Sequence, residues 1–347
     1  MLLQLIGRLN QPTKDAYSIS EIDARRVADN GLGPIFWALL QEGHVEASSQ
    51  SIELLQSADM TARVISARTR KNIDEVLGVL ESAGLEPVVL KGADVAQRFY
   101  PEPHWRVMGD LDLLLPNDTG HEALRLLEAE GFRNPTDHPA ERWDGHHHVV
   151  PVYHPDLKQW VEVHHRLITD QSPFHVESIF QGESVRKNLK SEVVGGRTVR
   201  FLTPTLTRLH TIVHWYFDLM DRWGNAGLQR PILDSLFMRR AGVAKPEEGL
   251  SEEIERACQL MDYILNRLEG RTASEGLWWP LPGNLAQIDG LSSEDSALQA
   301  ELAGAAFGVY LVAKSRLGFK ANLMRAWASV AINAVGQRLM PRQSQRL

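Results

Sequence analysis

Residues 106–116 read RVMGDLDLLLP, and two aspartates stand one position apart in an otherwise apolar run. In a β-strand, side chains at i and i+2 leave the same face, so Asp110 and Asp112 are predicted to point the same way. The leucines between and after them then point to the opposite face. Two like charges side by side repel each other, and neither favours an apolar core. The stretch therefore predicts a strand with one buried face and a polar face that serves a chemical purpose.

Paired carboxylates on one strand face are typical of sites that hold one or two Mg²⁺ ions against a nucleoside triphosphate, because hard oxygen ligands suit that ion. Two carboxylates rarely suffice. In QWVEVHHRL, residues 159–167, the alternation puts Glu162 and His164 on one face, so Glu162 is a candidate third ligand. An isolated Asp-x-Asp pair, or a single glutamate in a strand, is more often an exposed residue without function. The combination favours a metal site of Asp110, Asp112 and Glu162.

Upstream, VVLKGADVA at 88–96 predicts a short strand that ends at Lys91-Gly92 and is followed by a helix. Glycine lets the backbone approach a phosphate, and the N–H groups at a helix N-terminus bind anions. Lys91 adds a positive charge. An ordinary strand-to-helix turn explains the same residues, so both interpretations stay open.

The composition limits the classes of protein to which the chain can belong. Of 347 residues, 43% are hydrophobic, and the net charge of −7 argues against a large nucleic-acid surface. The single cysteine, Cys258, excludes an internal disulfide or a cysteine zinc site. The N-terminus turns polar too early for a signal peptide, and the longest apolar stretch, 303–313, is shorter than the roughly 20 residues of a spanning helix. We expect a soluble, cytoplasmic protein without a membrane span.

The chain divides into three predicted regions. Residues 1–84 are predicted to be helical and to end at a glycine stop, 85–203 to form an α+β core, and 204–347 to form a C-terminal helical domain. Gly195-Gly196 separates two strand-like segments and predicts a tight hairpin. The expected fold class is α+β, with a mixed sheet flanked by helices.

Seven of the thirteen histidines lie between 138 and 165. Imidazole is a common ligand of transition metals, so a histidine-based metallohydrolase is one alternative. Their spacing matches no zinc signature, and consecutive histidines in a strand point to opposite faces. We therefore expect His147 or His164 to line a nucleotide pocket and the other histidines to be packing or surface residues.

Three features after residue 204 have structural interpretations. His210 and His214 share a helix face at i and i+4 and are expected to pack. Arg230 and Asp234 have the same spacing and are expected to form an ion pair, with a pocket role for the arginine left open. The two tryptophans at 278–279 are expected to pack, although stacking on a base would suit them as well.

Several of these motifs together resemble the uncharacterised nucleotidyltransferase family of the DNA polymerase beta-like superfamily. The resemblance is strong over about 85–170 and looser through LHTIVHWYF and RPILDSLFM. The positions that match the family pattern are Lys91, Gly92, Tyr100, Pro101, Arg106, Asp110, Asp112, Gly131, Phe132, Glu162 and His164. The Gly-Ser that precedes the acidic strand elsewhere in the superfamily is replaced here by Lys-Gly, and the spacing to the first aspartate is long.

The resemblance implies the nucleotidyltransferase fold and transfer of a nucleoside monophosphate from an NTP, such as ATP, to an acceptor with release of pyrophosphate. Mg²⁺ or Mn²⁺ is the implied cofactor. The expected catalytic and metal-binding residues are Asp110, Asp112 and Glu162. The expected nucleotide-binding residues are Lys91, Gly92, Arg106 and His164. A small molecule or a peptide is favoured over RNA as the acceptor, and a nucleotide sensor without turnover is the alternative.

Overall fold

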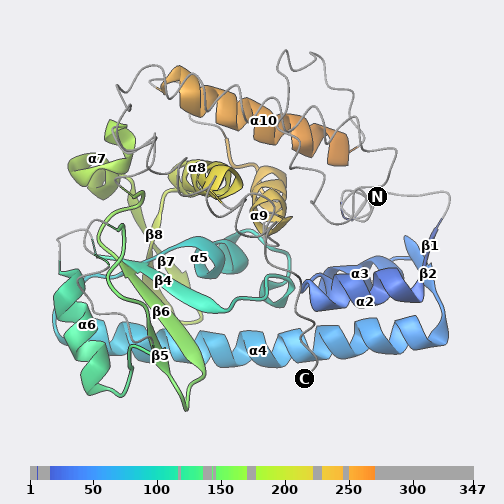
Figure 1. The fold of residues 1–347 in the computed structure, drawn as a ribbon, viewed down its shortest axis with the longest axis horizontal. Helices are drawn as coiled ribbons and strands as arrows, with labels where there is room; N and C mark the ends of the chain where they lie inside the picture. Colours follow the sequence, from blue (N-terminus) through green and yellow to red (C-terminus); the bar gives the residue numbers. More distant parts are fainter. Residues whose placement is uncertain are drawn as a thin grey trace, which may run out of the picture.

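The fold is described by a computed structural model (Figure 1). The residues it describes are 6, 16–115, 119–135, 143, 146–169, 177–221, 229–244 and 250–269. The predictions about the tryptophans at 278–279, the apolar stretch at 303–313 and a helical segment after 295 lie outside the described residues.

The N-terminal region is mostly helical, as predicted, but it also contains two strands that the sequence did not indicate. β1 and β2 pair in parallel, with Tyr17 opposite Val45. Ser20 caps the first long helix through its hydroxyl, which accepts a hydrogen bond from the Asp23 backbone N–H. Three-residue strands are too short for alternation to reveal. The elements are β1 (Tyr17–Ile19), α2 (Glu21–Asp29), α3 (Gly33–Gln41), β2 (Val45–Ala47) and α4 (Ser49–Ser82).

The central sheet is mixed and, within the described residues, has the strand order β5-β6-β4-β3-β8-β7. The inner pairs β4–β6 and β3–β8 are parallel, and the other neighbours are antiparallel. The predicted hairpin is confirmed, because Gly195 and Gly196 both have positive φ in the turn between β7 and β8. The strands are β3 (Val88–Val89), β4 (Asp110–Leu114), β5 (Val152–His154), β6 (Gln159–His164), β7 (Leu189–Val194) and β8 (Arg197–Leu202).

Helices cover both faces of this sheet (Figure 1). The long α4 lies on one side together with α6, and α8, α9 and α10 lie on the other. The remaining helices join these layers. They are α5 (Lys91–Arg98), η1 (Pro103–Trp105), α6 (Gly120–Ala129), η3 (Ser178–Phe180), α7 (Gly182–Lys187), α8 (Pro204–Asp221), α9 (Gln229–Arg240) and α10 (Glu252–Leu268). No helix in the described part of the chain is both long enough and apolar enough to cross a membrane.

The predicted alternation in β4 is confirmed. Leu111, Leu113 and Leu115 are buried in the hydrophobic cluster shared with α4 and α6. Asp112 faces the other way, as does Leu114, which packs in the second cluster with α8 and α9. The carboxylate of Asp112 therefore lies between two apolar layers, where an ionised group needs a partner.

The proposed domain boundary at residue 84 stays a prediction. α4, on the N-terminal side of that boundary, packs Ile73, Val76, Leu77 and Leu80 in the same cluster as the sheet. Gly84 ends this helix with φ of +80°, a conformation that favours glycine. The long helix is thus the layer beneath the sheet.

We expect Gly33→Ala to destabilise the fold, because a Cβ at this position would lie 2.5 Å from the Cβ of Ala58, where α3 packs against α4. Overpacking of this kind costs about 1–3 kcal/mol. Gly78→Ala is the matched control. It lies within α4, the Cβ would have 4.0 Å of room to the nearest atom, and alanine favours a helix by up to about 1 kcal/mol over glycine. Urea unfolding measures both, and equal effects would contradict the packing argument.

Candidate active site

The parallel pairing of β4 with β6 sets the acidic residues opposite one another. Asp112 is the register partner of Glu162, and Leu114 is the partner of His164. Asp112 and His164 are buried, whereas the Glu162 side chain is 25% exposed. Asp110 lies at the exposed start of β4, opposite Trp160. The register thus brings together the two segments that the sequence analysis linked.

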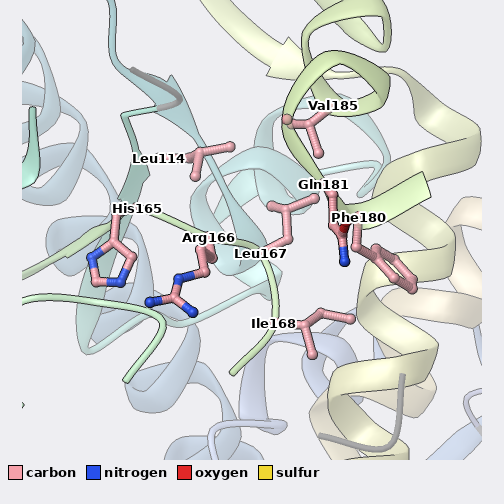
Figure 2. A pocket seen from close by; sticks show the side chains of 9 residues that line it. Leu114, His165, Arg166, Leu167, Ile168, Phe180, Gln181 and Val185 are labelled. Carbon is pink, nitrogen blue, oxygen red and sulfur yellow. The ribbon is translucent and has the colours of Figure 1, made fainter. Parts of the chain in front are cut away.

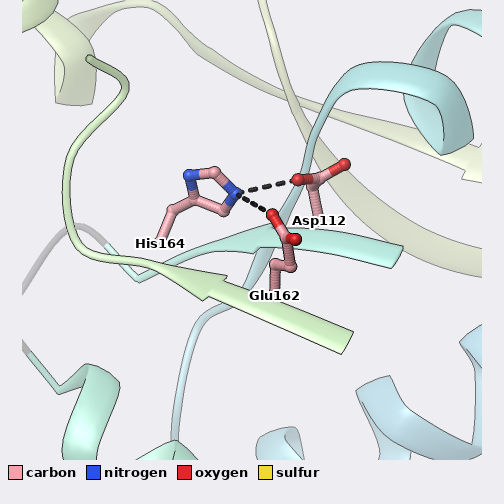
Figure 3. A group of neighbouring side chains, drawn as sticks. All are labelled: Asp112, Glu162 and His164. Carbon is pink, nitrogen blue, oxygen red and sulfur yellow. Dashed lines mark hydrogen bonds and ion pairs between the residues drawn. The ribbon is translucent and has the colours of Figure 1, made fainter. Parts of the chain in front are cut away.

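Three of these side chains form a compact group (Figure 3). His164 Nε2 lies 2.8 Å from Asp112 Oδ1 and 3.8 Å from Glu162 Oε2. One ligand atom from each of the three lies within 4.8 Å of the others, close enough to share one cation. Among the described residues, this is the one group of three or more histidine and acidic side chains with that spacing. Asp110 is not part of it. Carboxylate oxygens suit Mg²⁺ and Mn²⁺, so the donor set fits the implied metal.

Lys91 supplies a positive charge to this group from the start of α5. Its Nζ lies 2.8 Å from Asp112 Oδ1. Burial alone would lower the pKa of Lys91, but attraction to Asp112, Glu162 and Asp110 outweighs it and raises the pKa above its ordinary value. The backbone of Lys91 has φ of +48°, which an L-residue with a side chain adopts only at an energetic cost.

The carboxyl groups differ in their preference for protons. Burial raises the pKa of Asp112, but Lys91 and the hydrogen bond from His164 hold it well below its usual range. Burial and repulsion by Asp112 raise the pKa of Glu162 to about 7. The same two causes raise the pKa of Asp110, against the attraction of Lys91. An ionised Asp112 beside a protonated Lys91 is thus the centre of the site, and Glu162 is poised to exchange a proton near neutral pH.

His164 is neutral and has a defined tautomer. Burial and the charge of Lys91 lower the pKa of His164 to about 3, so the ring carries one proton. Nε2 faces the ionised Asp112 and donates to it. Nδ1 is then unprotonated, and it has no hydrogen-bond partner among the described residues.

A group of histidines lies behind His164. The rings of His147 and His164 are 4.9 Å apart, and His147 also lies 4.7 Å from His148 and 6.2 Å from His214 of α8. Burial lowers the pKa of His147 and of His148, so both are neutral. The described residues contain no three-histidine group with metal-ligand spacing, so the histidine-based alternative has no support in this region.

The Arg106 guanidinium is bound by Asp234 of α9. Its Nε donates to Asp234 Oδ1 over 2.8 Å and its Nη2 to Oδ2 over 3.1 Å, while the Tyr100 hydroxyl donates to Oδ1 over 2.8 Å. The expected pairing of Asp234 with Arg230 is therefore replaced by pairing with Arg106. Burial opposes the charge of Arg106, but Asp234 raises its pKa above the ordinary value.

Gly92 packs closely against two side chains. A Cβ at Gly92 would lie 3.2 Å from Met108 Cγ and 3.3 Å from Arg106 Nη2. These contacts are tight, so a larger residue would require both side chains to shift by a few tenths of an ångström. The glycine thus has a packing role in addition to the phosphate contact that the sequence predicts, which stays a prediction.

A buried network anchors α5, the helix that begins at Lys91. Arg98 Nη1 lies 2.7 Å from Asp94 Oδ1, and Thr207 of α8 donates to Asp94 Oδ2 over 2.8 Å. Arg98 also donates to the carbonyl of Leu202 at the end of β8. Burial raises the pKa of Asp94 to about 6 against the attraction of Arg98. The network fixes the helix against β8 and α8, and so fixes the backbone from which Lys91 extends.

A cavity of about 140 Å³ lies beyond the carboxyl ends of β4 and β6 (Figure 2). Apolar side chains line most of it, and the imidazole of His165 and the guanidinium of Arg166 line one part. Its lining residues are Leu114, His165, Arg166, Leu167, Ile168, Phe180, Gln181, Gly182 and Val185. Two of them directly follow His164 in the sequence, but Asp112, Glu162 and His164 are not among the lining residues.

The chain belongs to the family described as Uncharacterised nucleotidyltransferase, which matches residues 24–234. This match confirms the family that the sequence motifs indicate. It begins within α2 and ends at Asp234, so it includes every residue of the group around Asp112. A comparison with curated proteins finds no match.

Among solved structures, the chain is similar to the solution structure of the antibiotic-resistance factor ANT(2'')-Ia, with 12% identity over 59% of this chain and 97% of that chain and a TM-score of 0.37. A crystal structure of ANT(2'')-Ia with adenylyl-2''-tobramycin has 13% identity, coverage of 56% and 97%, and a TM-score of 0.34. An antigenic nucleotidyltransferase-like protein from Paracoccidioides brasiliensis has 18% identity, coverage of 60% and 92%, and a TM-score of 0.36. The family assignment rests on the sequence match.

Sequence reasoning missed two ion pairs of this site. Lys91 was expected to contact phosphate, and its pairing with Asp112 has no local sequence signal. Arg106 and Asp234 are 128 positions apart, so spacing could not reveal their contact. The family resemblance includes Arg106 and the segment that contains Asp234, but it does not show that the two residues are in contact.

We expect Asp234→Asn to destabilise the protein by roughly 3–5 kcal/mol, because it leaves the permanently charged Arg106 buried without a carboxylate. Urea unfolding measures the change. The control is Glu75→Gln, which removes the same charge from an ion pair with Lys71 whose side chains are 77% and 44% exposed. The control should cost less than about 1 kcal/mol. Equal costs for the two variants would show that the Arg106 pair contributes no more than a surface pair.

Proposed function

We propose that the protein is a Mg²⁺- or Mn²⁺-dependent nucleotidyltransferase that moves a nucleoside monophosphate from an NTP to an acceptor hydroxyl. The observation that carries the proposal is the opposition of Asp112 and Glu162 on parallel strands, with Lys91 and His164 beside them. Membership of the nucleotidyltransferase family supports the same reaction class.

The metal would be held by Asp112 and Glu162, with Asp110 on the same strand face as the further carboxylate. His164 donates to Asp112 Oδ1 and so orients that carboxylate, which is a positioning role in addition to the nucleotide contact proposed from the sequence. When bound, a divalent ion neutralises charge on the triphosphate and holds it in line for attack. The chain's own task is to bind and orient the reactants.

In the proposed reaction the acceptor oxygen forms a bond to the α-phosphorus, and the bond from that phosphorus to the bridging oxygen of the leaving group breaks. Pyrophosphate leaves with its electron pair. Glu162, the carboxylate opposite Asp112, accepts the proton of the hydroxyl in this proposal. Lys91, the backbone at Gly92 and the charge of Arg106 would steady the phosphates.

The proposed acceptor is a small molecule or a peptide, in preference to RNA. The net charge of −7 favours this choice, because a nucleic-acid surface normally needs a basic domain.

We expect the double variant Asp110→Asn with Asp112→Asn to lose metal-dependent binding of ATP, because the carboxylates that would hold the ion are then neutral. Calorimetry with Mg-ATP measures this. The matched control removes two exposed charges elsewhere, Asp156→Asn with Glu128→Gln, and should keep the affinity of the unchanged protein. Unchanged Mg-ATP affinity in the double variant of β4 would refute the metal assignment.

A sensor that binds nucleotide without turnover is the second candidate, favoured by the Lys-Gly sequence in place of Gly-Ser at the start of α5. The two candidates differ in pyrophosphate release. With labelled NTPs and a panel of small-molecule and peptide acceptors, a transferase should release pyrophosphate with at least one acceptor, and the release should stop in the Asp110, Asp112 double variant. Binding without release across the whole panel would favour the sensor.

A further inference from the structure

The ammonium group of Lys91 contacts a carboxylate that would hold the proposed metal. Its Nζ is 2.8 Å from Asp112 Oδ1, the same oxygen that accepts the hydrogen bond from His164 Nε2. Glu162 and Asp110 also attract it. Asp112 Oδ1 can contact the lysine and the imidazole at the same time. A divalent ion bound to that oxygen would lie close to the ammonium group and be repelled by its charge.

The backbone supports a function for this lysine beyond pairing. Lys91 has φ of +48°, a conformation that glycine adopts without strain and a lysine does not. The side chain is 23% exposed and the Asp112 side chain 4% exposed, so the ion pair is mostly shielded from water. The network of Asp94, Arg98 and Thr207 fixes the helix that follows. The structure therefore maintains a strained residue whose charge is directed into a group of acids.

We propose that Lys91 is a tethered counter-ion that occupies the cation position in the metal-free protein and leaves it for the triphosphate when metal and nucleotide bind together. This inference rests on the proposed function. A metal ion alone has to displace the ammonium group without offering it a new partner. A metal–triphosphate complex offers the phosphate oxygens as that partner. The site should thus bind metal weakly alone and bind metal with nucleotide well.

The alternative is that Lys91 only stabilises the fold by neutralising Asp112. A lysine that stays beside Asp112 repels the ion with or without nucleotide, so its removal should change both metal affinities in the same direction. A lysine that moves to the triphosphate repels the metal alone but helps to hold the metal–nucleotide complex, so its removal should strengthen the first affinity and weaken the second. Opposite changes in the two affinities therefore separate the two roles.

The experiment titrates Mn²⁺ without nucleotide into the full chain and follows free Mn²⁺ by electron paramagnetic resonance. We expect Lys91→Met to bind Mn²⁺ at least tenfold more tightly than the unchanged protein and Mn²⁺ with a non-hydrolysable ATP analogue at least tenfold more weakly. Lys91→Gln serves the same comparison if the methionine variant does not fold. Lys158→Met is the matched control, because Lys158 also has a positive φ, of 52°, but is exposed on the turn before β6. It should change neither affinity.

Unchanged or weaker binding of Mn²⁺ alone by a folded Lys91 variant, or tighter binding both with and without the ATP analogue, overturns the counter-ion role and leaves the proposed function intact. If neither the unchanged protein nor any variant binds Mn²⁺, with or without the ATP analogue, both the counter-ion role and the proposed function are overturned. Circular dichroism of each variant establishes that it is folded before the comparison is made.

Discussion

The parallel pairing of β4 with β6 is the constraint on which the rest of the site depends. Side chains alternate along a strand, so one register sets Asp112 opposite Glu162, and a slip by one residue would turn the acids into the cluster with α4. The leucines between and after the two aspartates, Leu111, Leu113 and Leu115, prevent that slip, because their burial on the other face fixes the register. The apolar core therefore determines the position of the charged site.

Charge balance is the second constraint. Carboxylates buried between two hydrophobic clusters would destabilise the fold if they had no positive partner. Lys91, at the start of α5, offsets the repulsion between these carboxylates. The neutral histidines behind His164 add polarity without adding charge. The arrangement keeps Asp112 ionised and lets Glu162 hold a proton near neutral pH, which is the separation of roles that acid–base chemistry needs.

The local parts of the fold could be predicted from the sequence, and the long-range parts could not. Alternation in β4, the glycine stop at Gly84 and the hairpin at Gly195-Gly196 depend on neighbouring residues, and all are confirmed. The strands β1 and β2 have too few residues for periodicity. The partner of Arg106 depends on how α9 packs, which no spacing along the chain encodes. The family resemblance indicated which residues matter but not which of them touch.

The contact between Arg106 and Asp234 also defines how far the chain can be shortened. The α+β segment proposed from the sequence ends at residue 203, yet the carboxylate that holds Arg106, and the threonine that holds Asp94, come from the helices that follow it. A fragment cut at 203 would carry a complete sheet, but Arg106 would lack its carboxylate and Asp94 would keep Arg98 and lose the hydrogen bond from Thr207. We therefore expect a fragment that keeps these contacts to extend into α9, where the family match also ends.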